Sequence, residues 1–298
     1  MDGHVTICDV GPRDGLQNEA TVLDPATRTE LVDRLAGAGL PRIEAVSFVN
    51  PRLVPAMAGA EEVMAAVHRH PGTTYAGLVL NERGYERAIA AGVDEVHYAF
   101  GVTDRFTQRN QASTTESAAG LSRRLVRRAR QDGIPITVTL SCAFGCPYEG
   151  RVSVANVLHV AEEVMHDPPD ELLVADTIGA GVPRQAAELV RGLVGLGVVA
   201  GVHLHNTRNT GIANAVAALD AGARVLDASV GGAGGCPFAP RATGNIATED
   251  LLYTLRGLGV HTGIDMDALI EITHWLEERL GKDLPSMVAK AGDFPAQG

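Results

Sequence analysis

Two histidines, His203 and His205, stand one residue apart in the run Gly201-Val202-His203-Leu204-His205. Side chains alternate along a strand, so both imidazoles would leave its end on one face while Leu204 points to the other. Two such nitrogens can share a metal ion, although two polar residues at a strand end explain the pair equally well. The choice depends on whether oxygen ligands arrive from elsewhere in the chain.

Candidate oxygen ligands stand near both ends of the chain. Asp14, in the run Gly11-Pro12-Arg13-Asp14-Gly15, offers a carboxylate beside the charge of Arg13, and Asn245 offers a neutral carbonyl oxygen. Taken alone, the first run is more typical of a plain turn. Together with the histidines, these residues form a mixed nitrogen and oxygen set with room for substrate. Such a set suits Mg²⁺ or Mn²⁺ better than a closed zinc site.

A glycine-rich run, Gly231-Gly232-Ala233-Gly234-Gly235-Cys236-Pro237, carries a thiol. Its glycines permit backbone movement, and Cys236 stands near the tip of the loop. A plain turn with a buried thiol is the alternative, whereas a phosphate loop is disfavoured because no GK[ST] or G-x-G-x-x-G spacing opens a helix here. Cys142 and Cys146 lack a second Cys or His pair, so we expect them to be inert.

Eight short apolar runs must position these groups. They begin near Val5, Arg42, Thr73, Glu95, Pro135, Glu171, Gly201 and Val225. Stretches with helical spacing separate them, at 26–39, 60–70, 83–92, 117–133, 155–167, 183–197 and 209–222, and several end in glycine, as helix C-termini do.

This alternation predicts a single α/β domain, a (β/α)8 TIM barrel over about 5–230, in which catalytic groups gather at the C-terminal ends of the strands. The glycine-rich loop and extra C-terminal helices follow at about 231–285. A doubly wound open sheet is the competing architecture.

Composition excludes several classes of protein. The 298 residues are 45% hydrophobic and carry a formal net charge of −11, which argues against nucleic-acid binding because counterion release needs clustered Lys and Arg. The basic run from Arg123 to Arg130 is typical of a solvated helix face. The chain shows no secretory leader, no membrane-length apolar run and no disulfide framework, so we expect a cytoplasmic protein that binds no membrane.

Six motifs in fixed order resemble the hydroxymethylglutaryl-CoA lyase family of metal-dependent TIM-barrel enzymes. They are GPRDGLQNE (11–19), IEAVSFVNP (43–51), SCAFGCPYEG (141–150), ADTIG (175–179), HLH (203–205) and GGAGGCPFAPRATGNIATEDL (231–251). The resemblance covers about Val5 to Thr262. It implies metal-assisted cleavage of 3-hydroxy-3-methylglutaryl-CoA, or of a closely related 3-hydroxyacyl-CoA, to acetyl-CoA and acetoacetate.

The resemblance also implies roles for residues. Asp14, His203, His205 and Asn245 would bind a divalent cation, Mg²⁺ or Mn²⁺. Arg13 would stabilise the enolate oxygen, Asp14 would accept the hydroxyl proton, and Cys236 would protonate the enolate. Glu44 and Asp176, at the ends of the second and sixth strands, would support the site. Gln17 and Ser47 would contact the substrate.

Two departures from the family concern the substrate. The family usually has Arg and Tyr in the fifth strand where this chain has Thr137 and Thr139, and Asp-Thr-Tyr-Gly where it has Asn206-Thr207-Arg208-Asn209. We hypothesise that Thr137, Thr139 and Arg208 adapt the substrate pocket, either by holding the distal carboxylate differently or by accepting a branch other than methyl.

Three other functions stay open at this point. One is a lyase for a different branched 3-hydroxyacyl-CoA, and the second is a Claisen condensing enzyme of the isopropylmalate or homocitrate synthase type. The third is a noncatalytic barrel that binds an acyl-CoA. In every case we expect a small acyl-CoA ligand and, because dimers are common among barrels, a homodimer or larger homo-oligomer.

Overall fold

The computed structural model describes residues 5–235 and 244–294. Within these ranges the strands are β1 (Thr6–Asp9), β2 (Arg42–Ser47), β3 (Thr74–Val79), β4 (Glu95–Gly101), β5 (Ile136–Ser141), β6 (Glu171–Asp176), β7 (Val199–Leu204) and β8 (Val225–Ala228). Every strand begins within two residues of the position expected from the sequence. Their apolar, β-branched runs suit parallel strands that are buried on both faces.

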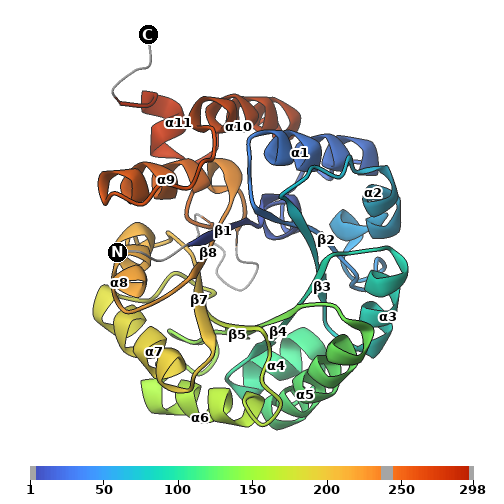
Figure 1. Cartoon of the computed structure of the whole chain (residues 1–298), viewed down its shortest axis with the longest axis vertical. Coiled ribbons are helices and arrows are strands. Elements are labelled where there is room, and N and C mark those ends of the chain that lie inside the picture. Colours follow the sequence, from blue (N-terminus) through green and yellow to red (C-terminus); the bar gives the residue numbers. More distant parts are fainter. Residues whose placement is uncertain (1–4, 236–243, 295–298) are drawn as a thin grey trace.

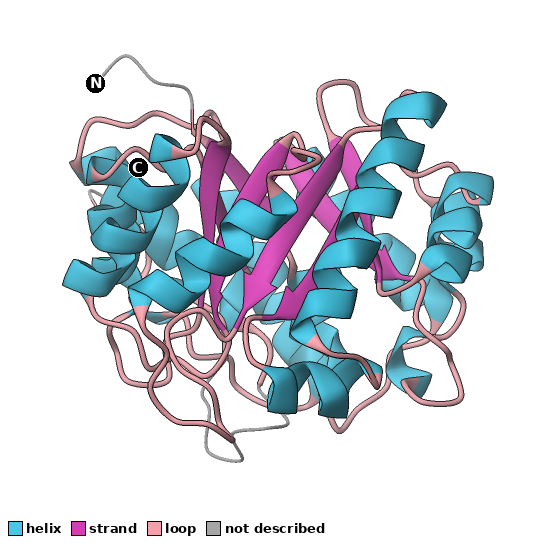
Figure 2. Cartoon of the chain, turned by 90° about the horizontal axis from the view of Figure 1, so that it is seen from below, coloured by secondary structure: helices cyan, strands magenta, loops and turns pink. Residues whose placement is uncertain are grey.

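The strands close into one parallel barrel in sequence order (Figures 1 and 2). Closure is made by β1, which pairs with β2 on one side and with β8 on the other, from Thr6 opposite Val225 to Asp9 opposite Ala228. An open doubly wound sheet would leave its first and last strands unpaired with each other. The predicted TIM barrel is therefore confirmed and the open sheet is excluded.

Helices surround the barrel (Figure 1). In the described ranges they are α1 (Pro25–Gly37), α2 (Ala60–Ala66), α3 (Glu82–Ala90), α4 (Asp104–Gln111), α5 (Thr115–Asp132), α6 (Val154–Val164), α7 (Pro183–Gly195), α8 (Gly211–Asp220), α9 (Thr248–Gly257), α10 (Met266–Leu280) and α11 (Met287–Ala291). Short helical turns, η1 (Gly11–Gly15), η2 (Pro55–Met57) and η3 (Val230–Gly232), join some of the elements. None of the helices in these ranges has the length and apolar character needed to cross a bilayer.

Local sequence sets the bounds of α5. Thr114 accepts a hydrogen bond from the Ser117 amide at its start, and Gly133 ends it with a φ of 71°, a left-handed conformation that glycine adopts without steric penalty. Four arginines of its basic run form ion pairs with acidic residues of α3, of α5 itself, of α6 and of the segment just after α6; they are Arg123, Arg124, Arg127 and Arg128. The expectation of a solvated helix face is confirmed.

Helix α4 was not expected from the sequence. Its residues, DRFTQRNQ, are almost all polar, and only Phe106 and Thr107 are buried, so no apolar period marks it. The helix follows β4 and lies between that strand and α5 (Figure 1), and most of its residues line the cavity at the barrel mouth. This position brings α4 to the mouth of the barrel.

The expected extra C-terminal helices are present: α9 and α10 complete the outer layer between α8 and α1, and α11 packs against α9 and α10 (Figure 1). Helix α9 also supports the glycine-rich run. Its Glu249 accepts hydrogen bonds from the Gly231 amide at 2.9 and 3.1 Å and from the Thr273 hydroxyl. A buried carboxylate thus holds the base of the run.

Candidate active site

The turn η1 carries Arg13 and Asp14 from the end of β1 to the barrel mouth. Asp9, the last residue of β1, holds the turn: one carboxylate oxygen accepts from the Gly11 amide at 2.8 Å and the other from the Thr248 hydroxyl at 2.7 Å. Burial outweighs these hydrogen bonds and raises the pKa of Asp9 to about 7. The turn is thereby anchored to both β1 and α9.

Three candidate ligand atoms meet above the barrel. Nε2 of His203 and Nε2 of His205 lie 3.2 Å apart, and each lies just under 4 Å from Oδ2 of Asp14, at 3.9 and 3.8 Å. All three residues belong to one cluster whose ligand atoms lie within 4.8 Å of one another. The predicted convergence of the first and seventh strand ends is therefore present in the structure.

Asn245 reaches the same cluster because its segment pairs with β7. Asn245 forms an antiparallel bridge with His205, and its Nδ2 donates to Asp14 Oδ2 at 2.9 Å and to the Ala233 carbonyl at 3.1 Å. The preceding Gly244 has a φ of +103°, and a Cβ there would lie 1.9 Å from the Gly234 carbonyl oxygen. Only glycine fits this close approach.

The donor set fits a divalent cation. The amide oxygen of Asn245 is buried and has no hydrogen-bond partner, although buried acceptors are normally satisfied. A cation shared with Asp14, His203 and His205 would supply the missing partner. Carboxylate, amide oxygen and imidazole together are suited to Mg²⁺ or Mn²⁺.

The protonation of the cluster agrees with this role. Burial and the neighbouring His203 lower the pKa of His205 to about 4, so its imidazole is neutral and has a free lone pair at pH 7. Burial opposes charge on Asp14, but Arg13 and the two histidines outweigh it and hold the pKa of that carboxyl below its ordinary value. Asp14 is thus a carboxylate, the form that binds metal.

Asp227 is a site residue that the sequence reasoning missed. Its Oδ2 lies 3.3 Å from Nδ1 of His203, its register neighbour across β7 and β8. Burial disfavours charge on His203, but this hydrogen bond and the charges of Asp227 and Asp14 raise its pKa. The sequence contained a signal for this role, because an acidic residue within a buried apolar strand needs a polar or charged partner.

Arg13 is held by two carboxylates. Its Nη1 donates to Asp14 Oδ1 at 2.6 Å, and its Nε donates to Glu44 Oε2. Glu44 is the third residue of β2 and lies inside the barrel, not at the strand end where the sequence reasoning put it. Its side chain is still at the site, because the interior of the barrel opens directly beneath Arg13.

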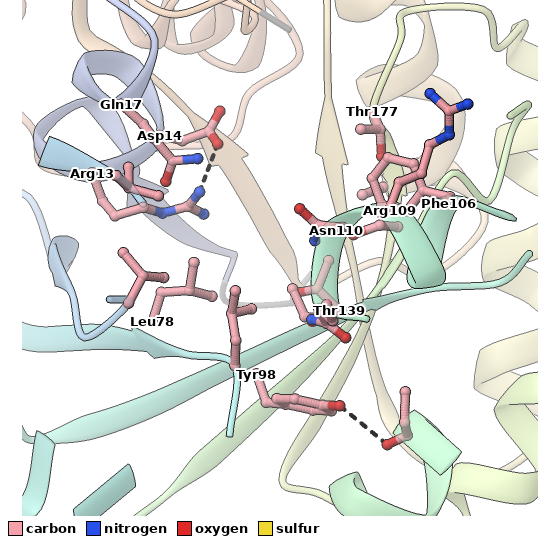
Figure 3. A pocket seen from close by; sticks show the side chains of 18 of the residues that line it. Arg13, Asp14, Gln17, Leu78, Tyr98, Phe106, Arg109, Asn110, Thr139 and Thr177 are labelled. Atoms are coloured by element: carbon pink, nitrogen blue, oxygen red, sulfur yellow. Dashed lines mark hydrogen bonds and ion pairs between the residues drawn. The ribbon is translucent and has the colours of Figure 1, made fainter. Parts of the chain in front are cut away.

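A cavity of about 760 Å³ opens over these groups. The expected site residues that line it are Arg13, Asp14, Gln17, Glu44, Thr139, His203 and His205. Figure 3 shows Arg13, Asp14 and Gln17 on one side of the pocket and Arg109, Asn110 and Thr177 on the opposite side. The pocket is large enough for an elongated small molecule.

Five other expected site residues in the described part of the chain do not line the cavity. They are Ser47, Thr137, Asp176, Arg208 and Asn245. The Ser47 hydroxyl is buried without a partner. Thr137 donates to Glu95 inside the barrel at 2.6 Å. Arg208 is exposed and donates to the carbonyls of Ile178 and Gly179 at 3.0 and 2.7 Å.

Asp176 stabilises the loop after β6. Its two carboxylate oxygens accept from the amides of Ala180 and Gly181, both at 2.8 Å. Burial outweighs these bonds and raises the pKa of Asp176. The side chain therefore shapes the rim of the site from outside the cavity lining.

The cysteines divide into two groups. Cys236 lies outside the described residues, but the neighbouring Gly235 lines the cavity and its carbonyl accepts from Asn18 at 3.0 Å. Cys142 and Cys146 are buried, and Cys146 accepts a hydrogen bond from Thr103 at 3.1 Å. Cys8 is buried as well, and none of these three cysteines belongs to the cluster of candidate metal ligands found among the described residues.

Arg109 on α4 is a second residue that the sequence reasoning missed. Arg13 and Arg109 are the arginines of the described lining, and Arg13 is already paired with acidic groups. The Arg109 guanidinium lies over the Tyr148 ring, 4.4 Å from its centroid. It supplies positive charge across the cavity from Arg13, in a chain that is acidic overall.

Comparisons with known proteins agree with this geometry. The family model described as HMGL-like matches residues 4–276. The (R)-citramalyl-CoA lyase of Chloroflexus aurantiacus is 48% identical, covering 97% of this chain and 95% of that protein. The 3-hydroxy-3-isohexenylglutaryl-CoA/hydroxy-methylglutaryl-CoA lyase of Pseudomonas aeruginosa is 42% identical, covering 96% of each. The structure of an HMG-CoA lyase from Acinetobacter baumannii in complex with coenzyme A and 3-methylmalate has a TM-score of 0.93 and 36% identity, covering 99% of this chain and 97% of that one.

Proposed function

Because the chain belongs to the HMGL-like family and is a carbon–carbon lyase of the hydroxymethylglutaryl-CoA lyase type, we propose that it cleaves 3-hydroxy-3-methylglutaryl-CoA, or a closely related 3-hydroxyacyl-CoA, to acetyl-CoA and an oxo acid. The observation that carries the proposal is the cluster of Asp14, His203 and His205 beside Arg13 at the floor of one cavity.

The reaction transfers a proton and breaks one carbon–carbon bond. The C3 hydroxyl loses its proton, its oxygen becomes the carbonyl of the oxo acid, and the C2–C3 bond breaks. The electron pair of that bond passes to C2 and the thioester oxygen as an enolate. A proton added at C2 then gives acetyl-CoA.

Asp14, His203, His205 and Asn245 would hold the divalent cation. When bound, the cation supplies Lewis acidity that lowers the pKa of the substrate hydroxyl and orients the substrate. Asp14 is the proposed acceptor of the hydroxyl proton. Because its neighbours keep the pKa of Asp14 low, its carboxylate is a weak base. It can accept the proton only from a substrate hydroxyl whose own pKa has been lowered.

Arg13 is the proposed electrostatic partner of the enolate. Its Nε and Nη1 are engaged by Glu44 and Asp14, whereas Nη2 has no hydrogen-bond partner among the described residues. Because Arg13 lines the cavity, Nη2 is available to a developing negative charge. A preorganised donor of this kind typically contributes about 3 kcal/mol to the transition state.

Cys236 is the proposed acid for C2. The described part of its loop supports this assignment, because Gly235 lines the cavity and the base of the run is fixed by Glu249. Gln17, on the wall beside Arg13 and Asp14 (Figure 3), is a proposed substrate contact. We further propose Ser47, Thr137, Asp176 and Arg208 as residues that shape the pocket from behind its lining.

(R)-Citramalyl-CoA is a second candidate substrate. The 48% identity with a lyase named for that thioester favours it. In citramalyl-CoA the carboxylate is attached directly to C3, whereas 3-hydroxy-3-methylglutaryl-CoA has one more methylene group. Cleavage would yield pyruvate in place of acetoacetate.

The test is an acetyl-CoA release assay with 3-hydroxy-3-methylglutaryl-CoA and both enantiomers of citramalyl-CoA. We expect metal-dependent release from at least one thioester, loss of activity with a chelator, and recovery with Mg²⁺ or Mn²⁺. The oxo acid formed identifies the substrate. Consumption of acetyl-CoA with an oxo acid, with no release from any thioester, would replace the proposal by a condensing function.

A further inference from the structure

The interior of the barrel beneath Arg13 contains a connected set of charged groups. Glu44 on β2 accepts from Arg13 with Oε2 and contacts Nδ1 of His97 with Oε1 at 2.8 Å. Nε2 of His97 lies 3.2 Å from Glu95 Oε1, and Glu95 Oε2 lies 3.0 Å from Arg42 Nε. These contacts lead from the floor of the cavity into the barrel without interruption.

Arg42 and Thr137 complete the set below His97. Arg42 forms a two-pronged pair with Glu171 at 2.6 and 2.9 Å. The Thr137 hydroxyl lies 2.6 Å from Glu95 and 3.1 Å from Glu171. Glu95 is therefore fixed from three sides, by His97, Arg42 and Thr137, and can serve as a rigid support for the imidazole.

His97 carries a positive charge on geometric grounds. Its ring lies between two carboxylates, and Glu44, Glu95 and His97 are at most 5% exposed. Both carboxylates face arginines and hence are ionised, so they can only accept hydrogen bonds. Both ring nitrogens must then donate, which makes the ring an imidazolium. Consistently, the hydrogen bonds to Glu44 and Glu95 outweigh burial and raise the pKa of His97 to about 10.

The position of Arg13 depends on Glu44. Glu44 divides its two oxygens between Arg13 and His97, so the imidazole fixes the rotation of the carboxylate that holds Nε of Arg13. Without that donor, one oxygen of a buried carboxylate would lose its partner, and buried polar groups reorganise to avoid that loss. A rotation of Glu44 would release Nε and turn the guanidinium away from its present direction.

We propose that His97 is a positioning residue that acts through Glu44 to aim the Arg13 guanidinium into the cavity. The inference rests on the proposed function for the role of Arg13 at the enolate. Neither His97 nor Glu44 forms a hydrogen bond or ion pair with Asp14, His203 or His205 in the described part of the chain. Loss of the imidazole should therefore affect turnover and leave metal binding unchanged.

The experiment compares His97→Gln and His97→Leu with the wild type on the substrate that the wild type cleaves. Loss of a partner that orients a functional side chain typically lowers activity about 10- to 100-fold. We expect kcat to fall by this factor in His97→Gln and further in His97→Leu, with KM and the Kd for Mn²⁺ nearly unchanged. Because His97→Leu can fail to fold, the Gln variant, which retains one donor, decides the result.

A double-mutant cycle with Arg13→Ala separates positioning from general damage. If His97 acts through Arg13, the His97→Gln substitution changes kcat little once Arg13 is absent, since coupled residues are not additive. Tyr85→Phe is the matched control: it removes a partly buried hydrogen bond of 2.9 Å from the Tyr85 hydroxyl to Asp132 on the outside of the barrel and should leave kcat unchanged. Unchanged kcat in folded His97→Gln, or the same loss in both backgrounds, would overturn the inference.

Failure of the proposed function would be recognised separately. If the wild type cleaves none of the thioesters, that proposal fails, and a crystal structure of His97→Gln decides the present one. Displacement of Arg13 from Glu44 would support positioning by His97. An unchanged pair between Arg13 and Glu44 would refute it.

Discussion

Nδ1 of His203 lies 3.3 Å from Oδ2 of Asp227, while Nε2 of the same ring faces Asp14 and His205. The carboxylate thus occupies the nitrogen that points away from the candidate metal site and leaves the other free to coordinate. An outer carboxylate of this kind orients the ring and raises its basicity as a ligand. Asp227 is therefore as much a part of the candidate site as Asp14, His203 and His205.

Replacing Asp227 with asparagine should weaken metal binding. The substitution preserves size but removes the charge that supports His203, and such changes typically cost about 10- to 100-fold in metal affinity. Titration of the protein with Mn²⁺ measures the effect. Asp220→Asn, at an exposed position at the end of α8, is the control and should bind Mn²⁺ as the wild type does. Equal affinities for all three proteins would contradict the role given to Asp227.

Arg109 should bind an anionic part of the substrate. It lines the cavity opposite Arg13 and forms no ion pair within the described residues, so its charge is available to a carboxylate or phosphate. We expect Arg109→Ala to raise KM about tenfold or more, the scale of a lost hydrogen bond to a charged group, with a smaller effect on kcat. Arg105→Ala, on the same helix but outside the cavity lining, should leave KM unchanged. Steady-state kinetics distinguish the two, and equal KM values would refute the assignment.

Thr139 should set the size of the acyl branch that the pocket accepts. It lines the cavity opposite Ala99 of β4 in the sheet register, and a tyrosine there would fill space that the threonine leaves open. We expect Thr139→Tyr to lower kcat/KM for a long-branched 3-hydroxyacyl-CoA relative to the methyl-branched one by about tenfold or more, as steric discrimination in a pocket allows. Thr139→Val, with the same size, should keep the wild-type ratio. The same ratio in all three proteins would mean that the branch lies elsewhere.

The His97 cluster should make stability depend on pH. Hydrogen bonds to Glu44 and Glu95 outweigh burial and raise the pKa of His97 from 6.5 to about 10. A raised histidine pKa contributes stability that is fully present below 6.5 and is lost as the pH rises through 10. For Glu95, hydrogen bonding and charge from His97 outweigh burial and lower the pKa from 4.5 to about 2. Its contribution is present above 4.5 and is lost as the pH falls through 2.

Urea denaturation of the wild type and His97→Gln tests this dependence. The deficit of the variant in free energy of unfolding should be largest between pH 4.5 and 6.5 and should shrink toward pH 10. The deficit of Tyr85→Phe, whose hydroxyl pairs with Asp132 away from this cluster, should change little from the acidic end of this range to neutral pH. A constant deficit for His97→Gln across the range would mean that the ring is not charged in the folded protein.

Much of the architecture follows from sequence patterns of short range. The β-branched runs predicted the first residue of every strand to within two positions. This was possible because burial on both faces of a strand selects such residues locally. The pair His203 and His205 and the turn at Asp14 were recognisable for the same reason, since residue type and a period of two are local properties. Helix α4 escaped this reasoning because its polar sequence has no apolar period, and Arg109 was missed with it.

The partners of these residues depended on the tertiary structure. Asp227 contacts His203, and Glu44 contacts His97, although the residues of each pair lie on different strands. The register of the closed barrel brings these side chains to the same level. The sequence likewise identified Thr137 and Arg208 as departures, but only the fold shows that one joins a buried cluster and the other binds loop carbonyls. Residue type and spacing along the chain determine which chemistry is available. Register, tilt and closure decide which atoms meet, and no periodicity along a single strand contains that information.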